Sequence, residues 1–216
     1  MFTPEVNADI LVRMEESTIA GFAIIIICLL VAMTVHEFTH AYVGYMLGDE
    51  TARSEGRISL NPLKHIDPLT TILLPAFTWV FLKVLVLAAK PVPFNPRNVR
   101  YGEYGAALIA LAGPLANLVL AVSASMLLHV VPLDSFGGAL LDIFRRLNVA
   151  LFVFNLIPIP PLDGSRVLYA FAPQPVQDFM EKIEPYGFLI IIALVLLGGL
   201  GGIVGNINTS ILNILP

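Results

Sequence analysis

The sequence is short of charged residues, has a single cysteine and contains no run of basic residues. Charged side chains make up 13% of its 216 residues, whereas soluble domains carry about 25%. With 57% hydrophobic residues and a mean hydropathy of +0.83, the composition favours an integral membrane protein. Cys28 has no partner for an internal disulfide. A net charge of −4 without a basic run gives nucleic-acid binding no support.

The N-terminal segment lacks the signature of a cleaved leader. Residues 1–17, MFTPEVNADILVRMEES, are acidic overall and have no positive region ahead of an apolar core. The first long apolar run is therefore expected to remain in the mature chain. Only Arg13 precedes that run, whereas Arg53, Arg57 and Lys64 follow it, so the loop after the run is expected to face the cytoplasm.

Apolar runs long enough to cross a bilayer recur along the chain. A spanning helix needs about 20 mostly apolar residues, and candidates lie at 18–47, 69–89, 105–131, from about 143 onward, and 186–205. We therefore predict an all-α membrane protein with one integral-membrane domain over the whole chain. The expected architecture is a polytopic bundle of about five to six transmembrane helices.

Two segments interrupt this pattern. GRISL, at 56–60, alternates polar and apolar positions and predicts a short strand, so a β-hairpin or re-entrant segment should follow the first helix. Pro158, Pro160 and Pro161 force the chain out of helical geometry. Unpaired backbone in lipid is costly, so this break should be buried in protein or line a wet cavity. Whether 69–89 crosses the membrane, or enters and leaves on one side, stays open.

The most unusual feature of the first apolar run is HEFTH, at 36–40. His36 and His40 are four residues apart and share one face of a helix, so both can bind one metal ion. Glu37 lies one step around the helix and can reach a metal-bound water without being a ligand. A carboxylate at the centre of a membrane helix costs about 3 kcal/mol on insertion scales. The pattern predicts a hydrolytic zinc site, with a buried polar packing cluster as the alternative.

A tetrahedral zinc site with an open position needs a third protein ligand. His65 lies in a loop and His129 near the end of an apolar run, so neither is favoured. Asp163, in PPLDG beside the proline break, is the better candidate, because its carboxylate would complete a site of two histidines, one aspartate and water. Taken alone, Asp163 would be the N-cap of the next helix. His65 and Asp67 are expected to satisfy local backbone groups, with a secondary metal or gating pair as the alternative.

HEFTH, GPLAN at 113–117 and NLIPIPPLDG at 155–164 together resemble the site-2 protease family (peptidase family M50) of intramembrane zinc metalloproteases. The resemblance is closest to the short prokaryotic members without PDZ or CBS domains. It covers about residues 20–170, and the combination of motifs is specific although H-E-x-x-H alone is not. It implies a catalytic core over about 18–172, followed by a C-terminal helix at about 186–205.

The resemblance also implies roles for single residues. One zinc ion per chain would be held by His36, His40 and Asp163, with Glu37 as the catalytic glutamate. Asn155 is suggested as a hydrogen-bond donor near the substrate carbonyl, and its alternative role is to satisfy backbone groups freed by the proline break. Another asparagine, the last residue of GPLAN, is expected to pack the third span against its neighbours.

The implied activity is hydrolysis of peptide bonds within or near transmembrane helices of membrane-protein substrates, in a multi-pass protein of a prokaryotic plasma membrane. The expected partners are thus a transmembrane protein or peptide substrate and the lipid bilayer, with no nucleic acid. A helical substrate must unwind before cleavage, and strand addition is proposed to hold it extended at Gly56, Arg57, Ile58, Ser59 and Leu60. The rival function is a multi-pass zinc carrier or another non-proteolytic zinc-binding membrane protein, which would have no need of Glu37.

Overall fold

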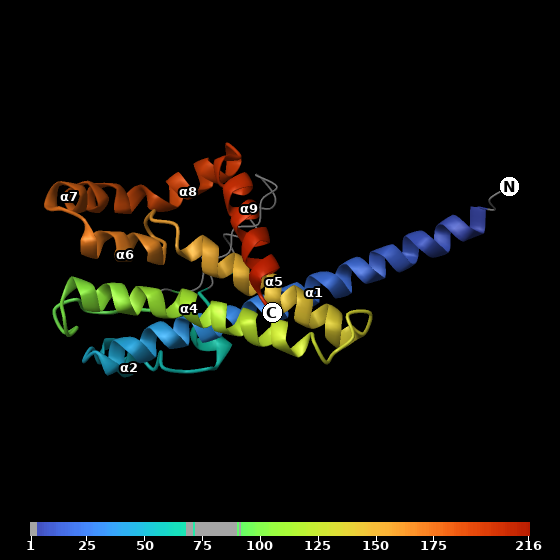
Figure 1. Cartoon of the computed structure of the whole chain (residues 1–216), viewed down its shortest axis with the longest axis horizontal. Helices are drawn as coiled ribbons and strands as arrows, with labels where there is room; N and C mark the ends of the chain where they lie inside the picture. The colour runs from blue at the N-terminus through green and yellow to red at the C-terminus, as the bar shows by residue number, and fades with distance from the viewer. Residues whose placement is uncertain (1–3, 68–70, 72–89, 91) are drawn as a thin grey trace.

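The computed structural model describes residues 4–67, 71, 90 and 92–216, and their regular structure is entirely helical (Figure 1). The all-α prediction is confirmed for this part of the chain. The α-helices and two short 3₁₀ helices are α1 (Pro4–Met46), α2 (Thr51–Ser54), η1 (Pro62–Lys64), α4 (Glu103–Leu127), α5 (Phe136–Asn155), α6 (Asp163–Phe171), α7 (Gln174–Ile183), η3 (Glu184–Tyr186), α8 (Gly187–Leu196) and α9 (Gly199–Ile214).

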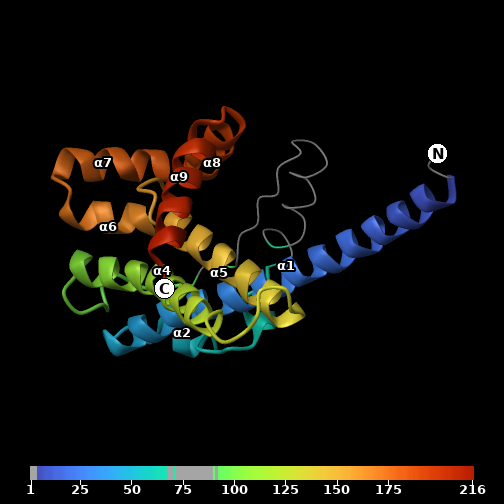
Figure 2. The same ribbon diagram turned by 45° about the vertical axis from the view of Figure 1, so that its right-hand side comes forward.

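Two of these helices are long and apolar enough to cross a bilayer. They are the Gly21–Met46 part of α1 and the whole of α4, which match the runs predicted at 18–47 and 105–131. The N-terminal part of α1 continues the helix away from the bundle (Figures 1 and 2). The run predicted at 69–89 lies outside the described residues apart from residue 71.

The single C-terminal helix predicted at 186–205 is wrong. Gly198 adopts a left-handed backbone conformation with φ of 71°, which ends α8 and lets the chain turn into α9. Glycine takes this conformation without the steric cost that a Cβ would impose. The apolar run therefore forms a helical hairpin, and α9 returns to pack on α5.

Helix α4 is the centre of the bundle and packs against α1, α5 and α6. Its buried face is rich in small residues, among them Ala106, Ala107, Ala110, Ala121 and Ala124. Small side chains let helix backbones approach closely, as membrane helices require. In both views α6 lies between α4 and α7, so the segment after the proline break is held against the central helix (Figures 1 and 2).

The proline break lies between the end of α5 and the start of α6, as predicted. Two glycines allow other backbone segments to approach it closely. A Cβ on Gly164 would lie 2.2 Å from the carbonyl oxygen of Leu156, and a Cβ on Gly187 would lie 2.1 Å from that of Pro160. Pro160 is buried while Pro158 is exposed, so the break is only partly covered by the described protein.

The strand predicted at 56–60 is not formed in this structure, and the described residues contain no strand. Instead, the buried guanidinium of Arg57 donates to the carbonyl oxygens of Lys64 (2.6 Å) and Lys90 (2.5 Å). Gly56 turns the chain with φ of 67°. These contacts draw the segment into a loop, and it pairs with no strand in the described part of the chain.

A buried aspartate closes the loop region against the end of α1. Asp49, 1% exposed, accepts hydrogen bonds from the Thr51 hydroxyl (2.6 Å), the Thr51 amide (3.2 Å) and the Asn95 amide (2.8 Å). The Asn98 side chain adds a longer contact of 3.5 Å. Burial alone would raise the pKa of this carboxyl, but these hydrogen bonds outweigh it and the pKa is lowered. We call these four residues the Asp49 clasp.

Candidate metal centre

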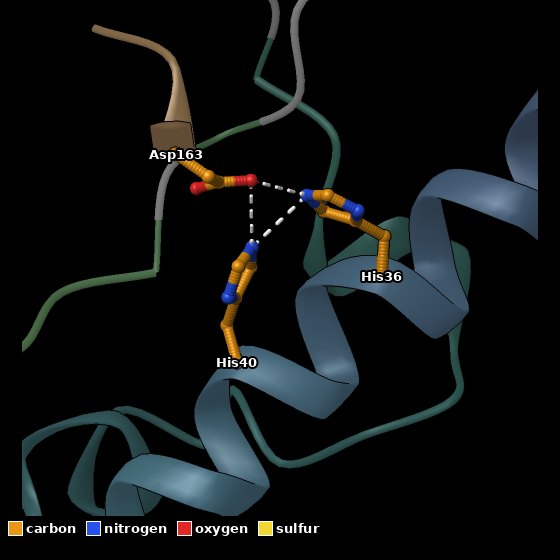
Figure 3. Close-up of side chains that lie close together, drawn as sticks. All are labelled: His36, His40 and Asp163. Atoms are coloured by element: carbon orange, nitrogen blue, oxygen red, sulfur yellow. Dashed lines mark hydrogen bonds and ion pairs between the residues drawn. The ribbon is translucent and has the colours of Figure 1, made fainter. Parts of the chain in front are cut away.

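Two histidines of α1 and the first residue of α6 converge in the bundle (Figure 3). The Nε2 atoms of His36 and His40 lie 2.9 Å apart. The Oδ2 atom of Asp163 lies 3.2 Å from the first and 3.3 Å from the second. Both histidines are 7% exposed. The structure thus brings together the three side chains that the sequence suggests as ligands, although α1 and α6 are far apart in the chain.

The separations fit a zinc ion. With metal–ligand distances of about 2.0–2.2 Å, adjacent ligand atoms of a tetrahedral site lie about 3.3 Å apart. The observed spacings of 2.9, 3.2 and 3.3 Å are close to that value. Among the described residues these are the ones whose ligand atoms group in a way that could hold a metal ion.

The hydrogen bonding of the three side chains also calls for a cation. The Nδ1 of His40 lies 2.7 Å from the Ile109 carbonyl oxygen, which can only accept, so Nδ1 donates and, in the neutral imidazole that binds metals, Nε2 presents a lone pair. The Oδ2 of Asp163 is buried and has no hydrogen-bond donor in the described part of the chain. A buried oxygen facing an acceptor nitrogen is unfavourable unless a positive ion lies between them.

The structure supports neither a capping role for Asp163 nor a ligand role for the two other histidines. The N-cap of α6 is Leu162, and Asp163 is the first helical residue, so its side chain does not act as a cap. His65 donates from Nε2 to the Ser59 carbonyl (2.7 Å), in agreement with the expected loop role. His129 contacts the Ser125 carbonyl (3.2 Å) just beyond the end of α4. Neither histidine joins the metal-binding group.

Helix α4 forms a wall of the centre, and Gly113 makes room for both imidazoles. A Cβ at this position would lie 2.3 Å from His40 Nε2 and 2.7 Å from His36 Cε1. Any larger residue would displace the rings from their present positions. The glycine of GPLAN thus has a steric role at the metal centre.

Asn117, predicted to pack helices together, contacts a proposed ligand directly. Its Oδ1 lies 2.6 Å from His36 Nδ1. Its Nδ2 donates to Asn148 Oδ1 on α5 (2.9 Å) and, at 3.4 Å, to the Ala32 carbonyl on α1. Both asparagines are completely buried. The spacing of residues in the sequence gives no signal for this contact, because His36, Asn117 and Asn148 lie on three different helices.

The remaining predicted residues lie around the centre without joining it. Glu37 is half-buried beside His36, and no described hydrogen bond or ion pair involves it. Asn155 donates to the Leu151 carbonyl (2.9 Å) inside the last turn of α5. Of the segment 56–60, Ile58 and Gly56 line a cavity of about 300 Å³ with Tyr42, Tyr45 and Arg53. None of the three converging side chains lines this cavity.

Comparison with known proteins agrees with this geometry. The family model described as "Peptidase family M50" matches residues 136–198, which include the proline break and Asp163. The chain is 38% identical over 183 residues to the "Putative zinc metalloprotease YwhC" of Bacillus subtilis, covering 79% of this chain and 78% of that protein. It is 30% identical over 187 residues to the "Putative zinc metalloprotease Rip2" of Mycolicibacterium smegmatis, covering 83% and 69%. No solved structure matches the chain.

Two relatives that align with most of the chain are named putative zinc metalloproteases, in agreement with the motifs of the sequence. Residues from the H-E-x-x-H helix and from the break after α5 meet at one buried point, and that point fits zinc. The chain therefore belongs to peptidase family M50, the site-2 protease family of zinc metalloproteases.

Proposed function

We propose that this chain is an intramembrane protease, which hydrolyses peptide bonds within or near the transmembrane helices of other membrane proteins. The observation that carries the proposal is the convergence of His36, His40 and Asp163 inside a bundle of apolar helices. At 1.5 Å per residue, the two histidines lie about 9–15 Å before the Met46 end of α1. A bilayer core is about 30 Å thick, so a spanning α1 would hold them below the headgroups.

His36, His40 and Asp163 are the proposed ligands of one zinc ion, and three protein ligands leave a position open for water or substrate. When bound, the ion supplies Lewis-acid activation of water and of the scissile carbonyl. The burial of the histidines and the apolar helices around them support this role, because a low-dielectric site strengthens electrostatic interactions.

Glu37 is the proposed general base and acid. It follows His36 directly on α1 and is engaged in no described hydrogen bond or ion pair, so its carboxylate is free to accept a proton. Glu37 would take a proton from the attacking water and deliver it to the leaving amine nitrogen as the C–N bond breaks. Asn155 is proposed to donate to the carbonyl oxygen as it becomes negative, which requires it to leave the Leu151 carbonyl.

The proposed setting is a multi-pass protein of the cell membrane with about five to six spans. The α5–break–α6 segment, the α7–α8 segment and α9 would add to α1 and α4. A substrate helix must be unwound before cleavage, and 56–60 is proposed to pair with it as a strand. That pairing would require the present loop conformation of this segment to open.

The decisive test compares Glu37→Gln with the wild-type chain. The purified full chain in detergent or vesicles is given a membrane-helix substrate labelled on both sides of the cleavage region. Glu37→Gln is expected to keep its zinc content and to lose cleavage by at least about 100-fold, as loss of a general acid–base group predicts. Glu55→Gln, an exposed glutamate after α2, is the matched control and is expected to cleave normally.

The same experiment addresses the rival zinc carrier. A carrier needs the ligands but no base beside them, so zinc transport into vesicles without any cleavage by the wild-type chain would favour it. Normal cleavage by Glu37→Gln would overturn the proposed mechanism.

A further inference from the structure

The two histidines of the metal centre are oriented in different ways. His40 donates from Nδ1 to a backbone carbonyl, that of Ile109. His36 faces the side-chain amide of Asn117 instead. An amide can present either an oxygen or an NH₂ group. The tautomer of His36 therefore depends on which way Asn117 is turned.

The neighbouring groups allow one orientation of Asn117, and the argument starts at a backbone carbonyl of α5. The Phe144 carbonyl oxygen only accepts, so the atom of Asn148 that lies 2.8 Å from it must be Nδ2. Asn148 then turns Oδ1 toward Asn117 at 2.9 Å. Because that oxygen also only accepts, Asn117 must present Nδ2 to it and turn its own Oδ1 toward His36.

The last step reaches the metal centre. The Asn117 Oδ1 lies 2.6 Å from His36 Nδ1 and can only accept, so the imidazole proton must be on Nδ1. In a neutral imidazole the other nitrogen then carries a lone pair, and this is the Nε2 that faces Asp163. We infer that Asn117 and Asn148 form an amide relay across α4 and α5 that holds His36 in its metal-binding tautomer.

Burial makes the relay necessary. Asn117 and Asn148 are both 0% exposed, so water cannot readily replace a missing partner. Without Asn148, the described acceptor that remains for Asn117 Nδ2 is the Ala32 carbonyl, at a long 3.4 Å, so Asn117 can turn over more readily and offer its NH₂ group to His36 Nδ1. This orientation favours the proton on Nε2, where it blocks metal binding. The inference rests on the ligand role of His36 within the proposed function, but not on proteolysis. Asn148 is a positioning residue, because it touches no ligand.

The test removes Asn148 and measures zinc binding and the imidazole proton rather than cleavage. Asn148→Ala in the purified full chain is expected to bind zinc 10–100-fold more weakly in competition with a chelating dye, the range typical of outer-shell partners. Nitrogen NMR of the metal-free chain with labelled histidine should show His36 protonated on Nδ1 in the wild type. The same spectrum of Asn148→Ala should show a mixture of tautomers.

A rescue variant and a control separate the relay from general loss of packing. A carboxylate accepts from His36 whichever way it is turned, so Asn117→Asp combined with Asn148→Ala should restore zinc affinity to within a few-fold of the wild type. Val149→Ala removes an equally buried neighbour outside the relay and should lower stability without changing zinc affinity. This control also truncates a buried side chain at the next position of α5.

The relay is refuted if Asn148→Ala binds zinc as tightly as Val149→Ala and its histidine spectrum is unchanged. The relay is also refuted if the double variant binds zinc no more tightly than Asn148→Ala alone. This second comparison still tests the relay if Asn148→Ala folds poorly. Either result leaves cleavage by the wild type, and its loss in Glu37→Gln, untouched, so the relay and the proposed function fail separately.

Discussion

Two aspartates near the membrane-spanning helices show how a structural carboxylate differs from one prepared for an ion. Asp49, in the clasp at the end of α1, accepts hydrogen bonds from an amide and a hydroxyl of Thr51 and from the Asn95 amide. Asp163 has a buried Oδ2 with no hydrogen-bond donor in the described part of the chain. Its neighbours are two imidazole nitrogens at 3.2 and 3.3 Å.

The two carboxylates differ in the groups that surround them. Around Asp49 the protein provides the positive ends of N–H and O–H dipoles, so the carboxylate is satisfied by the fold itself. Around Asp163 the neighbouring nitrogens are held as acceptors, at His40 by the Ile109 carbonyl. That arrangement fits a metal ion bound among the three side chains. Changing each aspartate should therefore affect different properties of the molecule.

The largest expected effect on zinc binding comes from Asp163→Asn. This change removes the ligand oxygen's charge and should weaken zinc binding by more than about 100-fold, beyond the range of outer-shell changes. Asparagine has nearly the shape of aspartate, so the metal-free variant is expected to fold. Chelator competition measures the zinc affinity, and thermal unfolding in detergent checks the fold. Asp134→Asn, an exposed aspartate, is the control, and normal zinc binding by Asp163→Asn would remove this residue from the site.

A smaller effect is expected from Gly113→Ala. The new Cβ would collide with His40 Nε2 at 2.3 Å and should weaken zinc binding by about 10–100-fold, as for other changes that disturb ligand orientation. Gly44→Ala is the matched control on the facing helix, since its Cβ would meet only Ile109 Cδ1, at an ordinary 3.7 Å. Equal zinc affinities for the two variants would show that the rings have more room than the structure gives them.

The smallest effect on zinc is expected from Asp49→Asn, which should act on stability instead. The new asparagine would turn its NH₂ group toward an N–H donor. This should lower the free energy of unfolding by about 1–3 kcal/mol and leave the zinc affinity unchanged. Glu50→Gln, on a side chain that is 73% exposed, should change little. Denaturant unfolding in detergent distinguishes them, and a zinc affinity that fell with Asp49→Asn would contradict the separation of the two regions.

The pH dependence follows from the lowered pKa of Asp49. Its contribution to stability is fully present above the ordinary value of 3.8 and is lost as the pH falls through the lower folded value. The stability difference between wild type and Asp49→Asn should therefore be constant near neutral pH and shrink below about pH 4. A difference that persisted unchanged at lower pH would mean that the carboxylate charge is not what the clasp uses.

The metal centre was more accessible to sequence reasoning than the fold. His36 and His40 are neighbours in the chain, so helical spacing alone predicts that they share a face. Asp163 required the proline break and the family resemblance, because spacing does not reveal contacts between distant helices. Asn117 and Asn148 had no such signal, since the partner of each lies on another helix. The space that Gly113 leaves for the imidazoles depends on helix packing and is equally invisible in one sequence.

The errors in the fold have physical reasons as well. Alternation at 56–60 resembled a strand, but a strand needs a partner, and the carbonyls bound by Arg57 hold the segment in a loop instead. The apolar run at 186–205 resembled one helix because hydropathy does not record that Gly198 has a left-handed backbone. Hydropathy predicted which segments are helical and apolar, whereas single glycines and the buried Arg57 determine where the described chain turns.

The close approach at Gly187 has a consequence for anyone who shortens this protein. A fragment that stops at Phe171 would carry both histidines, Glu37 and Asp163, and would appear complete by its motifs. It would lack the backbone of α8, which rests against Pro160 just ahead of the aspartate. We therefore expect the smallest fragment that keeps the proline break in place to extend at least to the start of α8.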